Sequence, residues 1–202
     1  MTVTSMGAAG NLTALDGTFE SGITGWSGTG GTLSWSSAQA QTGTRSALVT
    51  VSGSPTQAYI RPSGANLAPV NAGTQYRASG WIRSSSATAT AGASIDWYDS
   101  GLNYLSTSFS GGALVANTWT QYSVTGTAPA NAVYAGFGLG VAGSPANGTT
   151  VYFDNITWRA VDGNGGQLAT VTRAINGISK AHVAGAAVRI WMPARWAPDV
   201  RG

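Results

Sequence analysis

The chain of 202 residues contains almost no Glu or Lys, since Glu20 is its one glutamate and Lys180 its one lysine. These two residue types, and the ion pairs they form one turn apart, stabilise the exposed faces of helices in water. A surface helix laced with such pairs therefore cannot be built anywhere in this sequence. Charged residues make up 8% of the chain and hydrophobic residues 43%, and Gly, Ser, Thr, Ala and Asn dominate the remainder. This composition is typical of short strands and turns, and it predicts an all-β fold.

Nine runs of strand-forming residues are separated by clusters of Gly, Pro, Asn and Ser. The runs cover residues 32–37, 46–53, 57–62, 74–86, 92–100, 103–110, 118–127, 131–143 and 149–158. A further first strand is expected near residues 11–20. This spacing predicts a β-sandwich, and the length of the chain suits one domain of about 150 residues plus an appendage.

Successive side chains of a strand point to opposite sides of its sheet, so alternation assigns each side chain to a face. The predicted core set is Tyr76, Ala78, Gly80, Ile82, Ile95, Trp97, Tyr122, Val124, Val133, Ala135, Phe137, Leu139 and Val141, with Trp26 and Trp158. Opposite the apolar side of residues 133–141 lie Tyr134, Gly136, Gly138 and Gly140. The glycines predict a trough, which either receives a closely packed strand or loop or forms a groove for a ligand.

Aromatic and hydrogen-bonding side chains gather among the residues that alternation turns outward. Flat aromatic rings stack on sugar rings, while amides, acids and arginines hydrogen-bond sugar hydroxyls. The predicted ligand-binding residues, expected to share one outward face, are Arg77, Trp81, Arg83, Asp96, Tyr98, Trp119, Gln121 and Tyr134. The alternative is that Trp81 and Trp119 cover the sheet against a loop or a neighbouring protein.

The two ends of the chain differ from its middle. Residues 1–10 are small and lack periodicity, and we interpret them as a flexible leader or as a junction to another protein. Residues 159–202 comprise a Gly-rich linker, a β-hairpin predicted by Asn176-Gly177 and an extended arm with two prolines. Because a lone hairpin is marginal in water, this extension is expected to dock on the sandwich or on a neighbouring subunit. Its apolar contacts are expected from Ile175, Ile178, Val183, Val188, Ile190 and Trp191.

Catalysis has few groups to use in the predicted domain, which contains no histidine. Its acids are Asp16, Glu20, Asp96, Asp99 and Asp154, and glycoside hydrolysis needs two of them placed together. Asp96 and Asp99 are close in sequence but are expected to point in different directions, with Asp99 as a turn residue. The single histidine, His182, lies in the C-terminal extension. We therefore predict no catalytic residue and no enzymatic activity.

Several other classes are disfavoured. The absence of cysteine removes disulfide frameworks and thiolate metal sites. No run approaches 18 apolar residues, and residues 1–10 lack the basic and apolar parts of a secretion signal, so no membrane insertion is predicted. Residues 159–202 hold six of the ten Lys and Arg residues. These cations are spread out rather than clustered with aromatics, so nucleic acid is not an expected partner.

Five motifs, in their order and spacing, resemble a carbohydrate-binding module family, the jelly-roll modules attached to cellulases and xylanases. They occupy residues 11–26, 42–51, 76–83, 119–132 and 151–158. The resemblance covers residues 11–158 and implies a jelly-roll β-sandwich. Such modules also occur in phage tail proteins, and residues 170–188 resemble the C-terminal segment of minor tail proteins of actinobacterial phages.

The family resemblance also implies a structural calcium ion, Ca2+. The matching positions are Thr18, Glu20, Asp154, and Thr44 or Arg45 through their backbone carbonyls. Calcium takes six to eight hard oxygen ligands, which two carboxylates and several carbonyls can supply. The alternative is that Glu20 and Asp154 cap turns or pair with Arg45.

Together these inferences predict a non-enzymatic minor tail protein that binds cell-surface polysaccharide of the host. It is expected in the virion tail, outside the cell, in contact with other tail proteins and as a homo-oligomer in the assembly. One alternative is a purely structural tail-tip or decoration protein. The other is the accessory module of a secreted glycosidase, which the lack of a signal peptide and of a catalytic domain disfavours.

Overall fold

The computed structural model describes residues 2–5, 15–161 and 170–172. The chain divides into one unit formed by Met1–Ser5 with Thr170–Gly202 and a second unit, Met6–Ala169. In the first unit, strand β1 (Thr2–Ser5) pairs antiparallel with β13 (Thr170–Thr172). Both segments contain Thr and Val, whose branched side chains favour strands. Residues 2–5 of the predicted leader thus form a strand.

Other predictions for the ends of the chain cannot be compared with the structure. The predicted hairpin at Asn176-Gly177, His182 and the six apolar residues from Ile175 to Trp191 lie outside the described residues. The same is true of residues 6–14 and 162–169.

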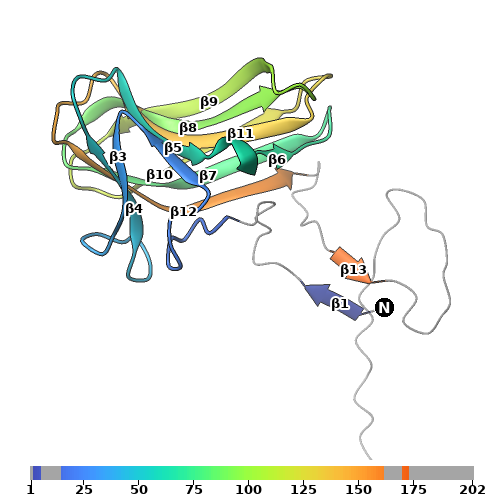
Figure 1. Cartoon of the computed structure of the whole chain (residues 1–202), viewed down its shortest axis with the longest axis horizontal. Coiled ribbons are helices and arrows are strands. Elements are labelled where there is room, and N and C mark those ends of the chain that lie inside the picture. The colour runs from blue at the N-terminus through green and yellow to red at the C-terminus, as the bar shows by residue number, and fades with distance from the viewer. Residues whose placement is uncertain (1, 6–14, 162–169, 173–202) are drawn as a thin grey trace, which may run out of the picture. The chain divides into compact units, whose positions relative to one another are not determined.

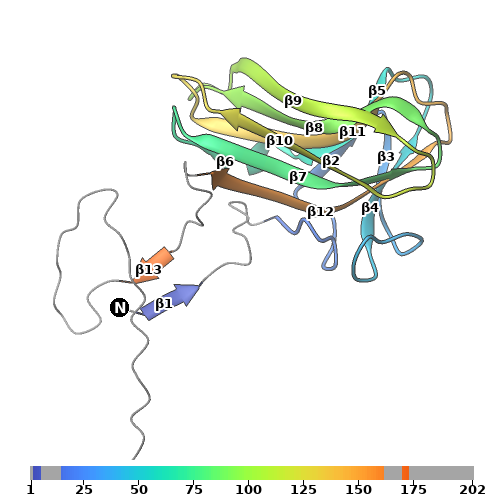
Figure 2. The ribbon, with the colours of Figure 1, turned by 180° about the vertical axis from the view of Figure 1, so that it is seen from behind.

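The second unit consists of two antiparallel sheets, which Figures 1 and 2 show as two layers. The five-stranded sheet has the order β10-β7-β12-β4-β3, and the six-stranded sheet has the order β2-β5-β11-β8-β9 with β6 beside β11. The strands of the first are β3 (Gly31–Ser36), β4 (Ser46–Val51), β7 (Gln75–Ser84), β10 (Thr120–Thr127) and β12 (Thr150–Val161). Those of the second are β2 (Trp26–Thr29), β5 (Gln57–Pro62), β6 (Ala68–Pro69), β8 (Thr88–Tyr98), β9 (Tyr104–Leu114) and β11 (Tyr134–Ala142).

This architecture confirms the predicted all-β jelly-roll sandwich. All nine predicted strand runs form strands, and the helical structure of the described residues is one 3-10 turn, η2 (Gly64–Asn66). Within that part of the chain no helix is long and apolar enough to cross a membrane.

The strand expected near residues 11–20 does not form in its described part, residues 15–20. The carboxylate of Asp16 accepts hydrogen bonds from the backbone N–H groups of Thr18, Phe19 and Ser21, which wraps the chain into a turn. Phe19 has a φ of 58°, in the left-handed region that an extended strand excludes. The short strand β2, which contains one Ser and one Gly in four residues, was not predicted.

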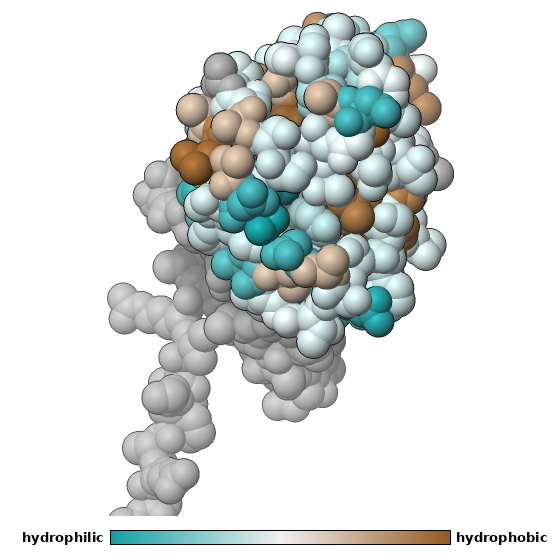
Figure 3. Space-filling view, turned by 90° about the vertical axis from the view of Figure 1, so that its left-hand side faces the viewer, coloured by the Kyte–Doolittle hydropathy of each residue, from teal (hydrophilic) through white to brown (hydrophobic). Residues whose placement is uncertain are grey.

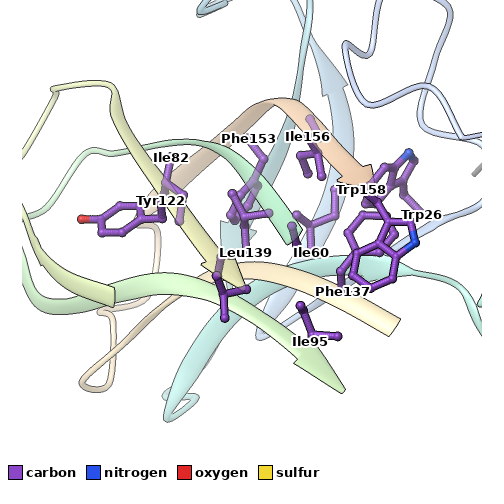
Figure 4. Packing of buried hydrophobic residues seen from close by; sticks show 14 of the residues in the cluster. Trp26, Ile60, Ile82, Ile95, Tyr122, Phe137, Leu139, Phe153, Ile156 and Trp158 are labelled. Carbon is purple, nitrogen blue, oxygen red and sulfur yellow. The ribbon is translucent and has the colours of Figure 1, made fainter. Parts of the chain in front are cut away.

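Aromatic rings fill the space between the two sheets. Trp158 of β12 stacks on Phe137 and on Tyr76 with ring centroids 5.4 and 5.1 Å apart, and Trp26 meets the edge of Phe137 at 5.8 Å. Figure 4 shows Trp26, Phe137 and Trp158 at one end of a row of Ile, Leu and Phe side chains from both layers. The prediction that Trp26, Trp97 and Trp158 are core residues is confirmed.

Val133 is the exception among the predicted core residues, since its side chain is 37% exposed. Strand β11 begins only at Tyr134, so the alternation of that strand does not extend to Val133. The surface of the described residues carries few charged side chains, as expected from the low content of charged residues. At the end of the molecule that faces the viewer in Figure 3, hydrophobic residues are scattered among hydrophilic and neutral ones.

Candidate functional site

The eight predicted ligand-binding residues lie on two opposite outer faces of the sandwich, so the prediction of one shared face is wrong. Arg77, Trp81, Arg83, Trp119 and Gln121 lie on or directly before strands of the five-stranded sheet, whereas Asp96, Tyr98 and Tyr134 lie on the six-stranded sheet. Alternation separates inward from outward side chains within one strand. It does not say to which sheet the strand belongs, and the outer faces of two packed sheets point away from each other.

On the five-stranded sheet, Trp81 and Gln121 stand opposite each other in neighbouring strands. Trp81 is partly exposed and Gln121 is exposed. Arg77 donates a hydrogen bond from its guanidinium to Ser123 Oγ over 3.2 Å. None of these residues lines the cavity that the six-stranded sheet carries.

A trough does lie on the outer face of the six-stranded sheet. Its floor is made by Gly138 and Gly140 of β11 and by Gly92 and Ser94 of β8, which stand opposite one another in register. Because three of these four residues lack a side chain, the floor is largely peptide backbone. The trough therefore runs along two neighbouring central strands.

Aromatic side chains from the flanking strands form its walls. Tyr59 of β5 stands opposite Gly140, and Phe109 of β9 stands opposite Ser94. A Cβ atom on Gly140 would lie 2.4 Å from Tyr59 Cβ, and one on Gly92 would lie 2.8 Å from the Phe109 ring, so both aromatics pack directly over glycines. The cavity between these walls has a volume of about 310 Å³. This volume is at the lower end of the range usual for small-molecule sites.

Both walls present accessible surface toward solvent. Phe109 is 58% exposed, and Tyr59 carries the guanidinium of Arg61 at 5.5 Å from its ring centroid. Such a cation over a ring contributes modest stabilisation at an exposed site and holds the ring in place.

Hydrogen-bonding groups lie at the end of the trough nearest Asp96. The Thr107 hydroxyl donates to Asp96 Oδ1 over 2.5 Å, which leaves its oxygen to accept the Tyr104 hydroxyl over 2.9 Å. Within the described residues, Asp96 Oδ2 has no such partner. Burial and the neighbouring Asp96 carboxylate raise the pKa of the Tyr98 hydroxyl, so Tyr98 stays a neutral donor and acceptor.

The two interpretations of the glycine row apply to different parts of it. A Cβ atom on Gly136 would lie 3.1 Å from the Leu67 side chain and 3.7 Å from Tyr98, so closely packed neighbours cover this position. Gly138 and Gly140 instead line the cavity. Neighbouring side chains therefore pack closely near Tyr134, and an open groove lies further along β11.

Sequence reasoning missed Tyr59, Arg61, Thr107 and Phe109 as members of this site. In residues 57–62 the buried side chains of Ala58 and Ile60 would have assigned Tyr59 and Arg61 to the outward face. That β5 and β9 flank the glycine row follows only from the strand order, which alternation does not contain.

The predicted calcium-binding residues lie around the loop that joins β3 to β4. Glu20 accepts hydrogen bonds from the backbone N–H groups of Thr44 and Arg45, both over 3.0 Å, and from the Thr44 hydroxyl. The fully buried Asp154 accepts the N–H groups of Gln41 and Thr42 over 2.7 and 3.1 Å. Both carboxylates therefore hold the same loop.

The charges of these two acids influence each other. Burial, the larger cause, and the nearby charge of Glu20 raise the pKa of Asp154 despite its three backbone hydrogen bonds. The N–H groups of Thr44 and Arg45 lower the pKa of Glu20. Two neighbouring carboxylates, one of them buried, form a donor set whose repulsion a hard cation would relieve.

The remaining predicted ligands differ from the expected arrangement. The Thr18 hydroxyl donates to Asp16 Oδ1 over 2.6 Å, and the Arg45 guanidinium lies 4.4 Å from the centroid of the Trp35 ring. For Thr44 and Arg45, the backbone contacts to Glu20 come from their N–H groups rather than their carbonyls. No group of three or more His, Cys, Asp or Glu side chains suited to a metal ion occurs in residues 2–5, 15–161 and 170–172.

Asp99 is a turn residue, as predicted. Its carboxylate accepts the N–H groups of Gly101 and Asn103 over 2.8 and 2.9 Å and also binds the Asn103 side chain. Asp96, three residues earlier, is held by Thr107 at the trough. The two carboxylates therefore serve separate local structures.

The chain matches a family model described as a carbohydrate binding domain over residues 12–137. No curated protein matches its sequence. A family 22 carbohydrate binding module of Clostridium thermocellum Xyn10B is similar in structure, with a TM-score of 0.56, 15% identity, and coverage of 78% of this chain and 98% of that one. The xylan-binding domain CBM22-1 of Paenibacillus barcinonensis Xyn10C has a TM-score of 0.55, 16% identity, and coverage of 75% and 95%.

A third similar structure is the enzymatically active domain of tailspike protein 4 of bacteriophage CBA120. Its TM-score is 0.54 at 18% identity, and the match covers 74% of this chain but only 22% of the tailspike chain. At these identities the structural likeness concerns the fold.

Proposed function

This chain belongs to the carbohydrate binding domain family, and from this premise we propose that the trough of the six-stranded sheet binds a chain of neutral sugars. The domain itself is a non-catalytic carbohydrate-binding module. The observation that carries the proposal is the glycine floor between Tyr59 and Phe109, with Asp96 and Thr107 at its end.

The chemistry of the trough suits a sugar chain. A floor without side chains lets a pyranose ring approach the backbone, and the aromatic walls offer apolar surface to its C–H faces. Asp96, Thr107, Ser94 and Gln57 line the same cavity and offer hydrogen bonds to hydroxyls. The Asp96 carboxylate repels anionic sugars, which favours a neutral chain.

Three single variants test the trough against the opposite face. Tyr59→Ala and Gly138→Leu should each weaken binding to neutral polysaccharides by at least about tenfold, as expected when an aromatic anchor is removed or its groove is filled. Trp81→Ala, on the five-stranded sheet, should bind as the wild type does. Affinity electrophoresis in xylan, mixed-linkage glucan and mannan measures the binding, and thermal melts establish that each variant is folded.

The opposite pattern of binding would assign the sugar site to the other sheet. If folded Trp81→Ala loses polysaccharide binding while Tyr59→Ala and Gly138→Leu retain it, the sugar binds the five-stranded sheet. If wild-type protein binds none of a broad array of neutral glycans, the scaffold has a structural role, as in the purely structural alternative.

We also propose that a calcium ion binds between Glu20 and Asp154. What supports it is the buried Asp154 carboxylate beside a second carboxylate, with no side-chain cation paired to either within residues 15–161. Glu20 and Asp154 would supply carboxylate oxygens, Thr18 its hydroxyl, and residues 44 and 45 their carbonyls only if the loop turned. A bound divalent cation would neutralise the two acids and connect the β3–β4 loop to β12.

Calcium removal should therefore lower the melting temperature. A ligand that binds only the folded state stabilises it by about 2.7 kcal/mol when its concentration is a hundredfold above Kd. Scanning calorimetry of EDTA-treated protein, with and without added Ca2+ or Mg2+, measures the change, and Glu20→Gln should abolish it. Identical melting curves in all three conditions would contradict the proposal.

For the biological setting we propose a phage minor tail protein whose jelly roll contacts host cell-surface polysaccharide. The resemblance of residues 170–188 and the occurrence of a similar domain in a phage tailspike support it. In this setting residues 159–202 would join the protein to other tail proteins or to further copies of itself, outside the host cell. The accessory-module alternative has its own support, since a Clostridium thermocellum structure containing CBM22-1 and GH10 xylanase modules is also similar.

A further inference from the structure

The outer face of the five-stranded sheet, remote from the trough, carries a group of arginines that pair with no acid of residues 15–161. Arg77 and Arg83 lie on β7 and Arg159 lies on β12, and all three are partly exposed. We call these residues, together with Trp81, the arginine face. Residues 15–161 contain five arginines and five acids, so three of the five cations of this part of the chain gather on one sheet surface.

Two of these arginines stand side by side. Arg77 and Arg159 are direct partners in the antiparallel pairing of β7 with β12, which places their Cα atoms about 5 Å apart. Like charges in such directly opposed positions destabilise a sheet. Their guanidinium groups form no ion pair with the acids of residues 15–161, and the one hydrogen bond recorded for them runs from Arg77 to Ser123.

The surroundings of the pair are polar and small. In the next row Ser79 and Thr157 share a hydrogen bond over 2.7 Å, with Ser123 opposite Ser79 on β10. Beyond them Trp81 stands between exposed Gln121 and buried Asp154, whose carboxylate already binds backbone N–H groups. Arg83 also belongs to the face. It lies about 20 Å from Arg77 along β7, since a strand rises by about 3.3 Å per residue.

We propose that the arginine face binds an anionic polysaccharide that carries carboxylate or phosphate groups. Arginine forks bind such groups with two parallel hydrogen bonds, and an anion between Arg77 and Arg159 relieves their mutual repulsion. Trp81 offers a ring face for a sugar, and the hydroxyls of the middle row hydrogen-bond sugar hydroxyls. An acidic glycan is favoured over nucleic acid because the described domain has no net positive charge, whereas nucleic-acid binding usually needs a basic surface.

This second site differs from the trough in position and in ligand charge, so a matched pair of polymers separates them. Carboxymethyl dextran and unmodified dextran share a backbone and differ in charge. The full-length wild-type chain should bind carboxymethyl dextran at least tenfold more tightly than dextran at 50 mM NaCl. Raising the NaCl concentration to about 300 mM should reduce this preference, because added salt screens exposed charges. Isothermal titration calorimetry measures the affinity at both salt concentrations.

Three variants of the full chain locate the binding. The double variant Arg77→Gln/Arg159→Gln should lose at least tenfold in affinity for carboxymethyl dextran while its melting temperature holds or rises. The matched control Arg189→Gln/Arg195→Gln removes the same charge from the C-terminal segment and should bind as wild type. Tyr59→Ala, which tests the trough, should also retain carboxymethyl dextran binding, so failure of one site is distinguishable from failure of the other.

Three outcomes would overturn the proposal. In the first, Arg77→Gln/Arg159→Gln binds carboxymethyl dextran as wild type does. In the second, the Arg189→Gln/Arg195→Gln control loses as much affinity, which assigns the effect to net charge. In the third, a single-stranded DNA oligonucleotide binds the wild type more tightly and depends on the same two arginines, which makes the partner a nucleic acid.

Discussion

Asp16 shows how one side chain organises the start of the domain. Its two carboxylate oxygens accept hydrogen bonds from the N–H groups of Thr18, Phe19 and Ser21 and from the hydroxyls of Thr18 and Ser21. Partial burial raises its pKa, but these hydrogen bonds outweigh burial and lower the pKa from 3.8 to about 2. The turn places Phe19 in the core, where its ring lies 5.3 Å from that of Trp26.

Because the folded-state pKa of Asp16 is depressed, its contribution to stability is present above pH 3.8 and is lost as the pH falls through about 2. Asp16→Asn should lower the free energy of unfolding by about 1.5–3 kcal/mol at pH 7, the usual scale for hydrogen bonds to a charged group. Urea titrations at pH 7 and pH 2 measure this difference, which should shrink at pH 2. A difference that stays constant over this range would show that charge plays no part.

At the scale of elements, β11 depends on close approach by its neighbour. A Cβ atom on Gly140 would lie 2.4 Å from Tyr59 Cβ and 2.8 Å from the Ala58 carbonyl oxygen, both on the neighbouring strand β5. A Cβ atom on Gly138 would meet nothing nearer than the Ser94 hydroxyl, at 3.2 Å. The two glycines share a face of one strand but have different tolerance for a side chain.

Gly140→Ala should therefore destabilise the protein by about 1–3 kcal/mol, because the added methyl group forces backbone or side-chain shifts. Gly138→Ala is the matched control and should change stability by less than about 1 kcal/mol. Chemical denaturation of both variants under one condition gives the comparison. Equal losses of stability in the two variants would mean that replacing a glycine within a strand, rather than crowding by Tyr59, causes the destabilisation.

Strands were the most predictable part of this molecule. Alternation located nine strands and separated Tyr76, Ile82 and Trp97 from their outward neighbours because burial on one face imposes a period of two. It failed at residues 15–20, where local hydrogen bonds to Asp16 override the extended conformation. It also placed Trp81 with Tyr98, because sheet order arises from pairings distant in sequence.

The candidate site was predictable only in part for the same reason. The glycines of β11 indicated a trough, and Asp96, one of the predicted ligand-binding residues, lies at its lining. Its walls, Tyr59 and Phe109, come from strands some fifty residues apart, as the numbering shows, and only three-dimensional pairing brings them to the same groove. Likewise, only the folded loop determines that Thr44 and Arg45 turn their N–H groups, rather than their carbonyls, toward Glu20.

At the scale of the whole molecule, the chain comprises two units of unequal structure. The sandwich has a continuous core, whereas β1 and β13 form a two-stranded sheet in the described part of the other unit. A two-stranded sheet alone is marginally stable in water. The stability of the sandwich should therefore not depend on the terminal segments.

A chain reduced to residues 6–169 should keep the melting temperature of the full-length protein and should be monomeric. If residues 159–202 mediate assembly, as proposed, the full-length chain should instead form a larger species. Light scattering after size-exclusion chromatography measures the mass of both. Unfolding of the shortened chain, or a monomeric full-length chain, would count against a separate docking role for the ends.

The backbone floor of the trough has an evolutionary consequence. Since Gly138 contributes no side chain, almost any replacement there narrows the groove, and a small side chain fits once the Ser94 hydroxyl, 3.2 Å from the added Cβ atom, shifts slightly. If the trough binds a sugar chain as proposed, loss or alteration of this recognition is one substitution away while the sandwich persists. Related domains can diverge in what they bind, or cease to bind at all, along a path on which every intermediate still folds.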